Sequence, residues 1–346
     1  MNFVELIPNI VKGIDVKKGS VVLIQFWGEN GDLNVLDKFA IEIAKKGGVP
    51  LKWQYSREFF KNYFSEVADE NLDFPDKYFE IFNVADMVID LCMYIPPSPH
   101  KDFPREKIPF YRNYMMKLFG SIRDKECFIQ IKVPTIENAE AAGIEFNLYE
   151  EAVLEAMGID YDNLKESCSC LIEKLYGKNI VEIYTGENSK LTFELGNREW
   201  HKDDGNGDIP CGEIYIAPIE ESAQGEIIIP NIYLQGKVYE NVIMKFIDGK
   251  LADCSEAEVL EHIKSYPGDC DVIGEFGVGL NENVRKLIGY TALDEKCIGT
   301  AHIAVGMNDM FGGKNSTPLH MDFVFTPSKI LIDNTVIMEN SNIVIK

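Results

Sequence analysis

The first 133 residues alternate short apolar runs with amphipathic segments, and this alternation restricts the fold more than any other feature of the sequence. Strands are expected at residues 21–26, 49–55, 87–94 and 127–133, and helices at residues 32–46 and 109–122. Repeated strand–helix units favour a parallel sheet that helices cover. We therefore predict an N-terminal α/β domain with a parallel sheet and a Rossmann-like order of elements.

The character of the sequence changes after a largely helical stretch at residues 137–176. Short strand-like runs then dominate, at residues 181–184, 190–194, 213–217, 226–230, 241–247, 302–305, 320–325 and 329–332. One helix is expected at residues 255–264, opened by a capping box of Ser255 and Glu258. A chain of 346 residues favours two domains. We predict the α/β domain at residues 1–160 and a β-rich α+β catalytic domain at residues 161–346.

The charge of the chain excludes several classes of partner. Its 56 acidic and 34 basic side chains give a formal net charge of −22, whereas binding to nucleic acid or to an anionic membrane needs a basic surface. No apolar run approaches the roughly 18 to 20 residues that span a bilayer, and the N-terminus does not resemble a signal peptide. The eight cysteines lack the spacing of a zinc site or of a disulfide scaffold. We expect reduced thiols and a cytoplasmic location.

The strongest chemical motif is His320-Met321-Asp322, which lies between apolar neighbours. In a strand, alternate side chains point to the same face, so His320 and Asp322 would lie side by side. Upstream, His302, Glu275 and Glu295 offer further nitrogen and oxygen donors. Such sets of donors bind divalent metal ions and activate water. The sequence therefore predicts a metalloenzyme.

Each of these residues also has a simpler interpretation. Glu275 lies in a glycine-spaced apolar stretch, so it is either a metal ligand or a buried structural carboxylate that needs another partner. Glu213 follows a turn rich in glycine and proline, and a solvated edge position is the usual alternative there. His302 in its apolar run could be a core histidine. Glu295 could be a ligand or a base beside the metal; an ion pair with the adjacent Lys296 is not expected.

The order of the motifs resembles the metallo-aminopeptidases of the aminopeptidase T and aminopeptidase S type, across about residues 181–326. The matching motifs are Pro210-Cys211-Gly212-Glu213, Gly274-Glu275, Asp294-Glu295-Lys296, Gly299-Thr300-Ala301-His302 and His320-Met321-Asp322. The resemblance implies a homodimer that cleaves peptides with a free N-terminus. It also implies two divalent ions per chain, of Zn, Co, Mn or Mg, held by Glu213, Glu275, His302, His320 and Asp322, with Glu295 as the base.

The family has a site tyrosine seven residues after its first histidine, where this sequence has Asp309. Tyr290 and Lys314 are the candidates to replace this tyrosine.

A second resemblance, carried by residues 312–322, is to 2,5-dihydroxypyridine dioxygenase. That resemblance would make His302, His320 and Asp322 a facial triad for one Fe(II). A triad does not need the three further carboxylates of Glu213, Glu275 and Glu295, so the peptidase interpretation is favoured. A metal-free binding protein with a relict pocket is the third alternative.

Overall fold

The computed structural model describes residues 2–123, 125, 127–186 and 189–345. The chain divides into two compact units. The first contains the residues up to Tyr161 together with Gly205–Pro210, and the second contains Asp162–Asp204 and Cys211–Lys346.

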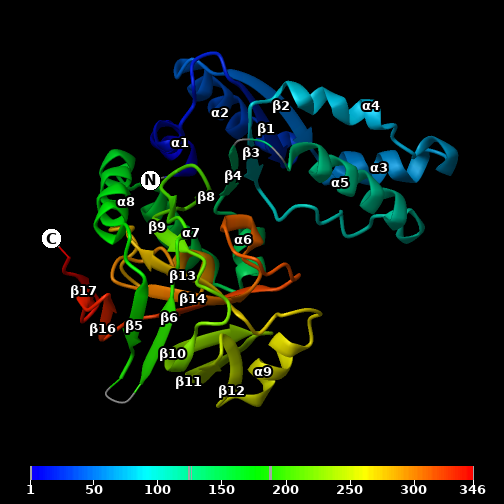
Figure 1. The fold of residues 1–346 in the computed structure, drawn as a ribbon. Coiled ribbons are helices and arrows are strands. Elements are labelled where there is room, and N and C mark those ends of the chain that lie inside the picture. Colours follow the sequence, from blue (N-terminus) through cyan, green and yellow to red (C-terminus); the bar gives the residue numbers. More distant parts are fainter. Residues whose placement is uncertain (1, 124, 126, 187–188, 346) are drawn as a thin grey trace. The chain divides into compact units, whose positions relative to one another are not determined.

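The first unit is built on a five-stranded parallel sheet of order β2-β1-β3-β4-β8 (Figure 1). Its strands are β1 (Val21–Trp27), β2 (Val49–Tyr55), β3 (Met87–Cys92), β4 (Cys127–Lys132) and β8 (Asp208–Ile209). Its helices are α1 (Phe3–Gly13), α2 (Leu33–Lys45), α3 (Arg57–Glu66), α4 (Asp76–Phe79), α5 (Ile108–Ile122), α6 (Ile136–Ala142) and α7 (Phe146–Met157). The predicted parallel α/β architecture is confirmed.

Burial explains why the two central strands, β1 and β3, have continuous apolar sequences rather than alternating ones. All six residues of β3 are buried, as are six of the seven residues of β1. A parallel sheet covered on both faces requires such sequences. An aromatic-rich cluster packs α3, α4 and α5 against Leu23, Trp27 and Val88, while α1 and α2 lie on the other side of the sheet in Figure 1.

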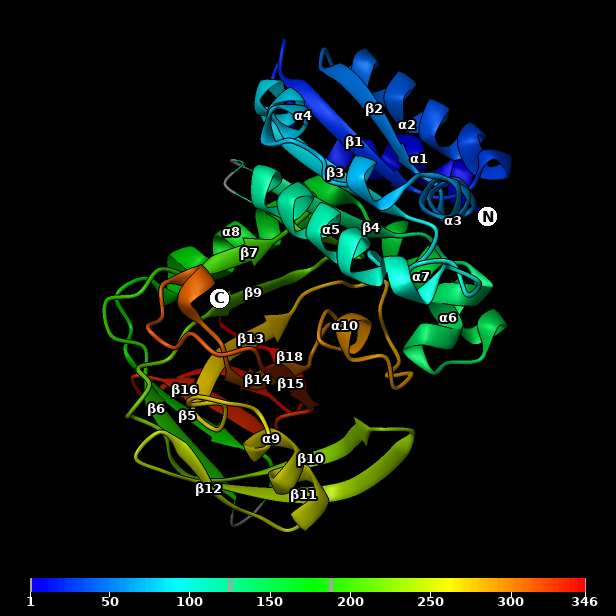
Figure 2. The same cartoon turned by 90° about the vertical axis from the view of Figure 1, so that its right-hand side faces the viewer.

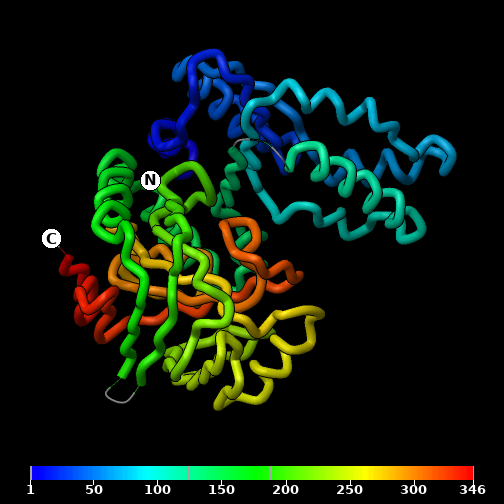
Figure 3. Tube along the Cα trace, in the orientation of Figure 1, coloured from blue at the N-terminus to red at the C-terminus, as the bar shows by residue number. Residues whose placement is uncertain are grey.

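The second unit contains two antiparallel sheets. The larger has the order β12-β11-β10-β6-β5-β16-β17-β18. Its strands are β5 (Ile180–Tyr184), β6 (Lys190–Glu194), β10 (Gln224–Leu234), β11 (Lys237–Ile247), β12 (Lys250–Cys254), β16 (Lys329–Ile332), β17 (Thr335–Glu339) and β18 (Asn342–Ile343). In Figure 3 the red C-terminal segment runs beside the green β5, in agreement with the antiparallel pairing of β16 with β5.

The smaller sheet has the order β15-β14-β13-β9-β7, and Figure 2 shows β7, β9, β13 and β14 following one another across it. Its strands are β7 (His201–Asp203), β9 (Glu213–Ile216), β13 (Ile273–Gly279), β14 (Ala301–Gly306) and β15 (His320–Phe325). The helices α8 (Tyr161–Leu175), α9 (Ala257–Lys264) and α10 (Thr291–Asp294) complete the secondary structure. The predicted β-rich character of this half is confirmed.

The predicted capping box at Ser255 is wrong. The helix α9 begins at Ala257 and its N-cap is Glu256, with no side-chain hydrogen bond to the first turn. The Ser255 hydroxyl instead accepts a hydrogen bond from the backbone N–H of Ile243 in the neighbouring strand. A serine hydroxyl can accept a hydrogen bond from a backbone N–H of a helix or of a strand, and here it accepts one from the strand β11.

Across the described part of the chain, every helix falls short of the length or the apolar composition that a membrane-spanning helix needs.

Candidate metal centre

All the metal ligands suggested by the sequence lie on one face of the smaller antiparallel sheet of the second unit. The antiparallel register places Glu213 opposite Gly279, His302 opposite Gly277, and both Glu275 and Asp322 opposite Ala304. Directly paired residues on neighbouring strands share a face, and so do residues two apart along one strand. The alternation predicted for His320 and Asp322 thus extends over four adjacent strands.

Residues without large side chains make room for these groups. A Cβ atom at Gly277 would collide with the imidazole ring of His302, and one at Gly279 would collide with backbone oxygens of Glu295 and Cys297. The glycines of the Gly274–Gly279 stretch therefore allow the ring and the 295–297 turn to approach the strand closely.

Glu275 lies at the middle of the centre and turns its two oxygens to different partners. Its Oε1 is 3.0 Å from His302 Nε2, which is also 3.6 Å from Glu213 Oε2. Its Oε2 is 3.4 Å from His320 Nε2, which is 3.3 Å from Asp322 Oδ1. The ligand atoms of Glu275, His320 and Asp322 all lie within 4.8 Å of one another. The side chains thus form two donor groups that share Glu275.

A backbone carbonyl orients one of the two histidines. His320 Nδ1 lies 2.8 Å from the carbonyl oxygen of Met307. A carbonyl oxygen can only accept, so Nδ1 carries the proton and Nε2 faces the carboxylates. Orientation of a ligand histidine through its other nitrogen is usual at metal sites.

Two buried polar atoms of the centre have no hydrogen-bond partner within the described structure: Glu213 Oε2 and His302 Nδ1. Glu213, Glu275 and His302 are all buried, which corrects the interpretation of Glu213 as a solvated edge residue. A buried carboxylate oxygen without a partner is costly. A cation between Glu213, His302 and Glu275 would remove that cost.

The protonation equilibria indicate the same surplus of negative charge. Burial raises the pKa of Glu275, and it raises the pKa of Glu295 to about 8 against the opposing charge of Lys296. Burial would lower the pKa of both histidines. Nevertheless, the carboxylates around them raise the pKa of His302 to about 9 and that of His320 to about 10. A cluster that retains protons so strongly suits a divalent cation, which would replace those protons as the source of positive charge.

Lys296 is a member of the centre that the sequence interpretation missed. Its ammonium hydrogen-bonds Glu213 Oε1, lies 2.9 Å from Glu295 Oε1, and lies 3.5 Å from Asp203 Oδ2. The expectation that Glu295 and Lys296 do not pair is therefore wrong. Adjacent side chains diverge along a regular helix or strand, but Glu295 is the C-cap of α10, where the helix stops. The long lysine side chain can therefore fold back.

Asp294 holds this turn in place. Its carboxylate accepts hydrogen bonds of 2.8 Å from the backbone N–H groups of Ile288 and Gly289. The hydroxyl of Thr300 donates to the carbonyl oxygen of Cys297 at 2.7 Å. The segment that carries Glu295 and Lys296 is thus tied down on both sides.

An aromatic group borders the centre and was also missed. Tyr215 shares the face of Glu213 on β9, and its ring stacks on that of His201 with centroids 5.4 Å apart. The ring of Phe311 lies 5.5 Å from that of Tyr215 and 6.0 Å from that of His320. His201 belongs to the strand β7. The spacing His201-Lys202-Asp203 repeats that of His320-Met321-Asp322, and this repetition was the available signal.

Asp309, which stands in place of the family tyrosine, is exposed on a short 3-10 turn at Asp309–Phe311.

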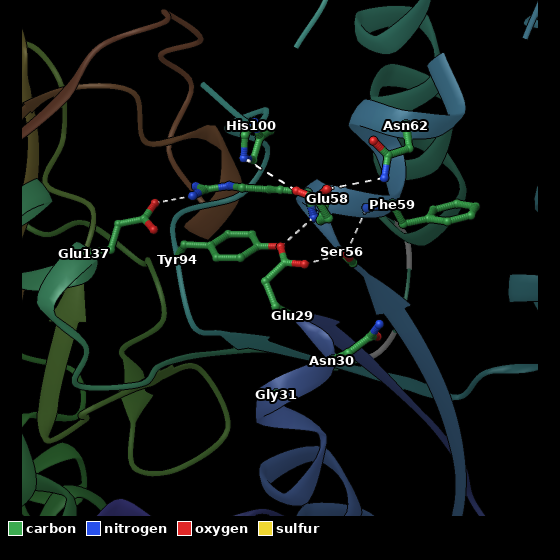
Figure 4. A pocket seen from close by; sticks show the side chains of 11 residues that line it. Glu29, Asn30, Gly31, Ser56, Glu58, Phe59, Asn62, Tyr94, His100 and Glu137 are labelled. Carbon is green, nitrogen blue, oxygen red and sulfur yellow. Dashed lines mark hydrogen bonds and ion pairs between the residues drawn. The ribbon is translucent and has the colours of Figure 1, made fainter. Parts of the chain in front are cut away.

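The first unit has a cavity of its own, of about 710 Å³, which follows the carboxyl ends of β1 and β2 (Figure 4). The charged side chains of Glu29 and Arg57 in this cavity already have partners. Glu29 accepts hydrogen bonds from Ser56 and from the backbone N–H of Arg57, and the Arg57 guanidinium pairs with Glu137 and stacks 3.6 Å above the Tyr94 ring. Among the described residues, the group of possible metal ligands Glu275, His320 and Asp322 lies in the second unit instead.

Solved structures share this fold. AmpT from Thermus thermophilus superposes with a TM-score of 0.67 at 16% identity, covering 99% of this chain and 100% of that one. A 2,5-dihydroxypyridine dioxygenase from Pseudomonas putida KT2440 superposes with a TM-score of 0.64 at 14% identity, covering 99% of this chain and 97% of that one. Identities this low show a common fold only.

Comparison of sequences identifies the family, which these superpositions do not. No curated protein sequence matches the chain. The sequence profile of the thermophilic metalloprotease (M29) family, however, matches residues 2–341, which is nearly the whole chain. The ligand set on the sheet face agrees with a metal-dependent hydrolase. The chain therefore belongs to the thermophilic metalloprotease (M29) family.

Proposed function

We propose that this protein is a metal-dependent aminopeptidase that removes the N-terminal residue of peptides, with two divalent ions in the centre. The division of the two Glu275 oxygens between the His302 group and the His320 group supports this proposal above all. A carboxylate that faces two donor groups is suited to bridge two ions. Glu213, Glu275 and His302 would hold one ion, and Glu275, His320 and Asp322 would hold the other. Zn, Co, Mn and Mg all suit these ligands.

Bound in this centre, divalent ions would supply the Lewis acidity that activates a water molecule and polarises a peptide carbonyl. Glu295 is the proposed base, which accepts a proton from the attacking water and passes it to the leaving amine. Its raised pKa of about 8, caused by burial, suits a group that takes up a proton near neutral pH. The surrounding carboxylates would attract the positive α-amino group of the substrate and so favour cleavage at the N-terminus.

A ring-cleaving dioxygenase is the second candidate, because of the likeness to the Pseudomonas putida enzyme. In that case His302, His320 and Asp322 would hold one Fe(II). The buried Glu213 and Glu275 argue against this candidate, since a triad of His302, His320 and Asp322 would use neither carboxylate as a ligand. A metal-free binding protein is disfavoured for the same reason, because it would leave all of these acidic side chains without a metal ion.

The metal content of protein purified without added metal or chelator tests these candidates. Metal analysis would be followed by reconstitution with Co, Zn, Mn and anaerobic Fe(II). Bound divalent metal together with cleavage of amino-acid anilides would support the aminopeptidase. A single iron with oxygen consumption on dihydroxypyridines would support the dioxygenase, and an absence of binding under every condition would support the binding protein. The homodimer and the cytoplasmic location stay predictions, and light scattering of the purified protein tests the first of them.

A further inference from the structure

The Lys296 side chain places its ammonium group inside the proposed centre. Its side chain is only 4% exposed and lies among the carboxylates of Asp203, Glu213 and Glu295. All three carboxylates lie within ion-pair distance of its Nζ atom. A metal ion that enters the centre therefore meets a cation that is already in place.

The Lys296 ammonium contacts one of the two donor groups. Lys296 hydrogen-bonds Glu213, which belongs only to the group around His302. The other group consists of Glu275, His320 and Asp322. The two groups also differ in access to solvent, because the side chains of His302 and Glu213 are 1% and 7% exposed, whereas those of His320 and Asp322 are 24% and 20% exposed.

Two physical effects act in the same direction. An ion at the His302 group would be repelled by the nearby ammonium, and repulsion between like charges is strong where water is excluded. The same ion would have to share the Glu213 carboxylate with the lysine, since one Glu213 oxygen already accepts the Lys296 hydrogen bond. Lys296 also acts on Asp322 of the His320 group, but through its charge, and that group is more exposed.

We propose that Lys296 makes the two ion positions unequal. The ion held by Glu275, His320 and Asp322 binds first and tightly, and the ion held by Glu213, Glu275 and His302 binds second and is readily exchanged. This inference rests on the proposed function. Lys296 acts here as a positioning residue, because it sets the occupancy of the second ion through Glu213 and through its charge.

The test is calorimetric titration of chelator-treated full-length protein with Co²⁺, with metal content measured in parallel. We expect two binding events whose dissociation constants differ by about tenfold or more, since one neighbouring charge near a buried site changes binding by at least that factor. Lys296→Met should bring the two constants together, whereas Lys296→Arg should keep them apart. Lys190→Met removes the same charge from an exposed pair with Glu182 and should change neither constant.

Two ligand variants assign the events: His302→Ala should remove the weak event, and His320→Ala the tight one.

Two events of equal affinity in the wild type would overturn the inference and leave the proposed function intact. An unchanged gap in Lys296→Met would overturn it as well. No binding of any ion would overturn both the inference and the proposed function. Should Lys296→Met fail to fold, the ratio of the two constants in the wild type and the assignments from the histidine variants decide the question.

Discussion

At the scale of single residues, Glu295 can separate the chemistry of the centre from its capacity to bind metal. Its side chain pairs with Lys296 and belongs to neither of the two proposed donor groups that share Glu275. Glu295→Gln keeps the size of the side chain but removes the proton acceptor, so we expect turnover to fall by roughly 10²- to 10⁴-fold with metal content unchanged. Steady-state kinetics and metal analysis of the same sample measure both. Glu221→Gln, at an exposed position in the same unit, is the control. Turnover at the wild-type level would rule out Glu295 as the base.

Gly277 tests how closely His302 must approach the sheet. An added Cβ would collide with the imidazole ring, so Gly277→Ala should displace His302 and weaken binding of the ion that it holds. We also expect a loss of about 1–3 kcal/mol in the free energy of unfolding, the usual cost of overpacking.

Calorimetric titration and denaturant unfolding measure the two effects of Gly277→Ala. Gly120→Ala places the same methyl group at a helical position with no atom within 4 Å, and it should leave both quantities nearly unchanged. Normal metal binding by Gly277→Ala would show that the contact with His302 is not needed.

Single residues also show what the sequence could and could not predict about the centre. His320 and Asp322 were predictable, because a two-residue spacing in a strand is a local pattern. Lys296 was not, since its partners Glu213 and Asp203 are far away along the chain and meet it only through the sheet. The burial of Glu213 was missed for the same reason.

At the scale of the elements, β3 contains a buried carboxylate in the middle of the parallel sheet. Asp90 is 1% exposed, lies opposite Gln25 of β1, and burial raises its pKa to about 7. A folded-state pKa above the unfolded value of about 3.9 means that protonation favours the native state. The resulting stability is fully present below about pH 4 and is lost as the pH rises through about 7.

Asp90→Asn removes this ionisation. We expect it to stabilise the protein at pH 8 by on the order of 2–4 kcal/mol relative to its effect at pH 4. Denaturant unfolding at both pH values measures the difference. Asp76→Asn, whose side chain is 89% exposed, should show little pH dependence. An equal effect of Asp90→Asn on the free energy of unfolding at the two pH values would mean that burial does not raise the pKa of Asp90.

The elements differed in how well they could be predicted from sequence. The central strands β1 and β3 were predictable because a buried parallel strand leaves a continuous apolar run. The outer strands β2 and β4 are less buried, and they were predicted from their place in the alternation of strands and helices. The strand β7 was missed, since its three residues are polar and two of them serve the centre. The two-residue strand β8, which adds to the parallel sheet beside β4, is too short to leave any periodic pattern.

At the scale of the whole molecule, metal binding should stabilise one unit selectively, because every proposed ligand lies between Cys211 and Lys346 in the second unit. A ligand at 100 times its dissociation constant stabilises the unit that binds it by about 2.7 kcal/mol. We expect Co²⁺ to slow amide hydrogen exchange in β9, β13, β14 and β15, with little change in β1 and β3. Exchange followed by mass spectrometry of peptides measures this, with Mg²⁺-free chelated protein as the reference. Equal protection of both sheets would contradict a centre confined to the second unit.

The proposed ligands of the centre come from four strands, and β15 is the last of them along the chain. The full set of donors therefore exists only after β15 has joined β14, however early the other strands form. The weak visible absorption of hydrated Co²⁺ changes in intensity and wavelength when nitrogen and carboxylate ligands replace its water. This change in absorption during refolding in the presence of Co²⁺ would report the time at which β15 pairs with β14.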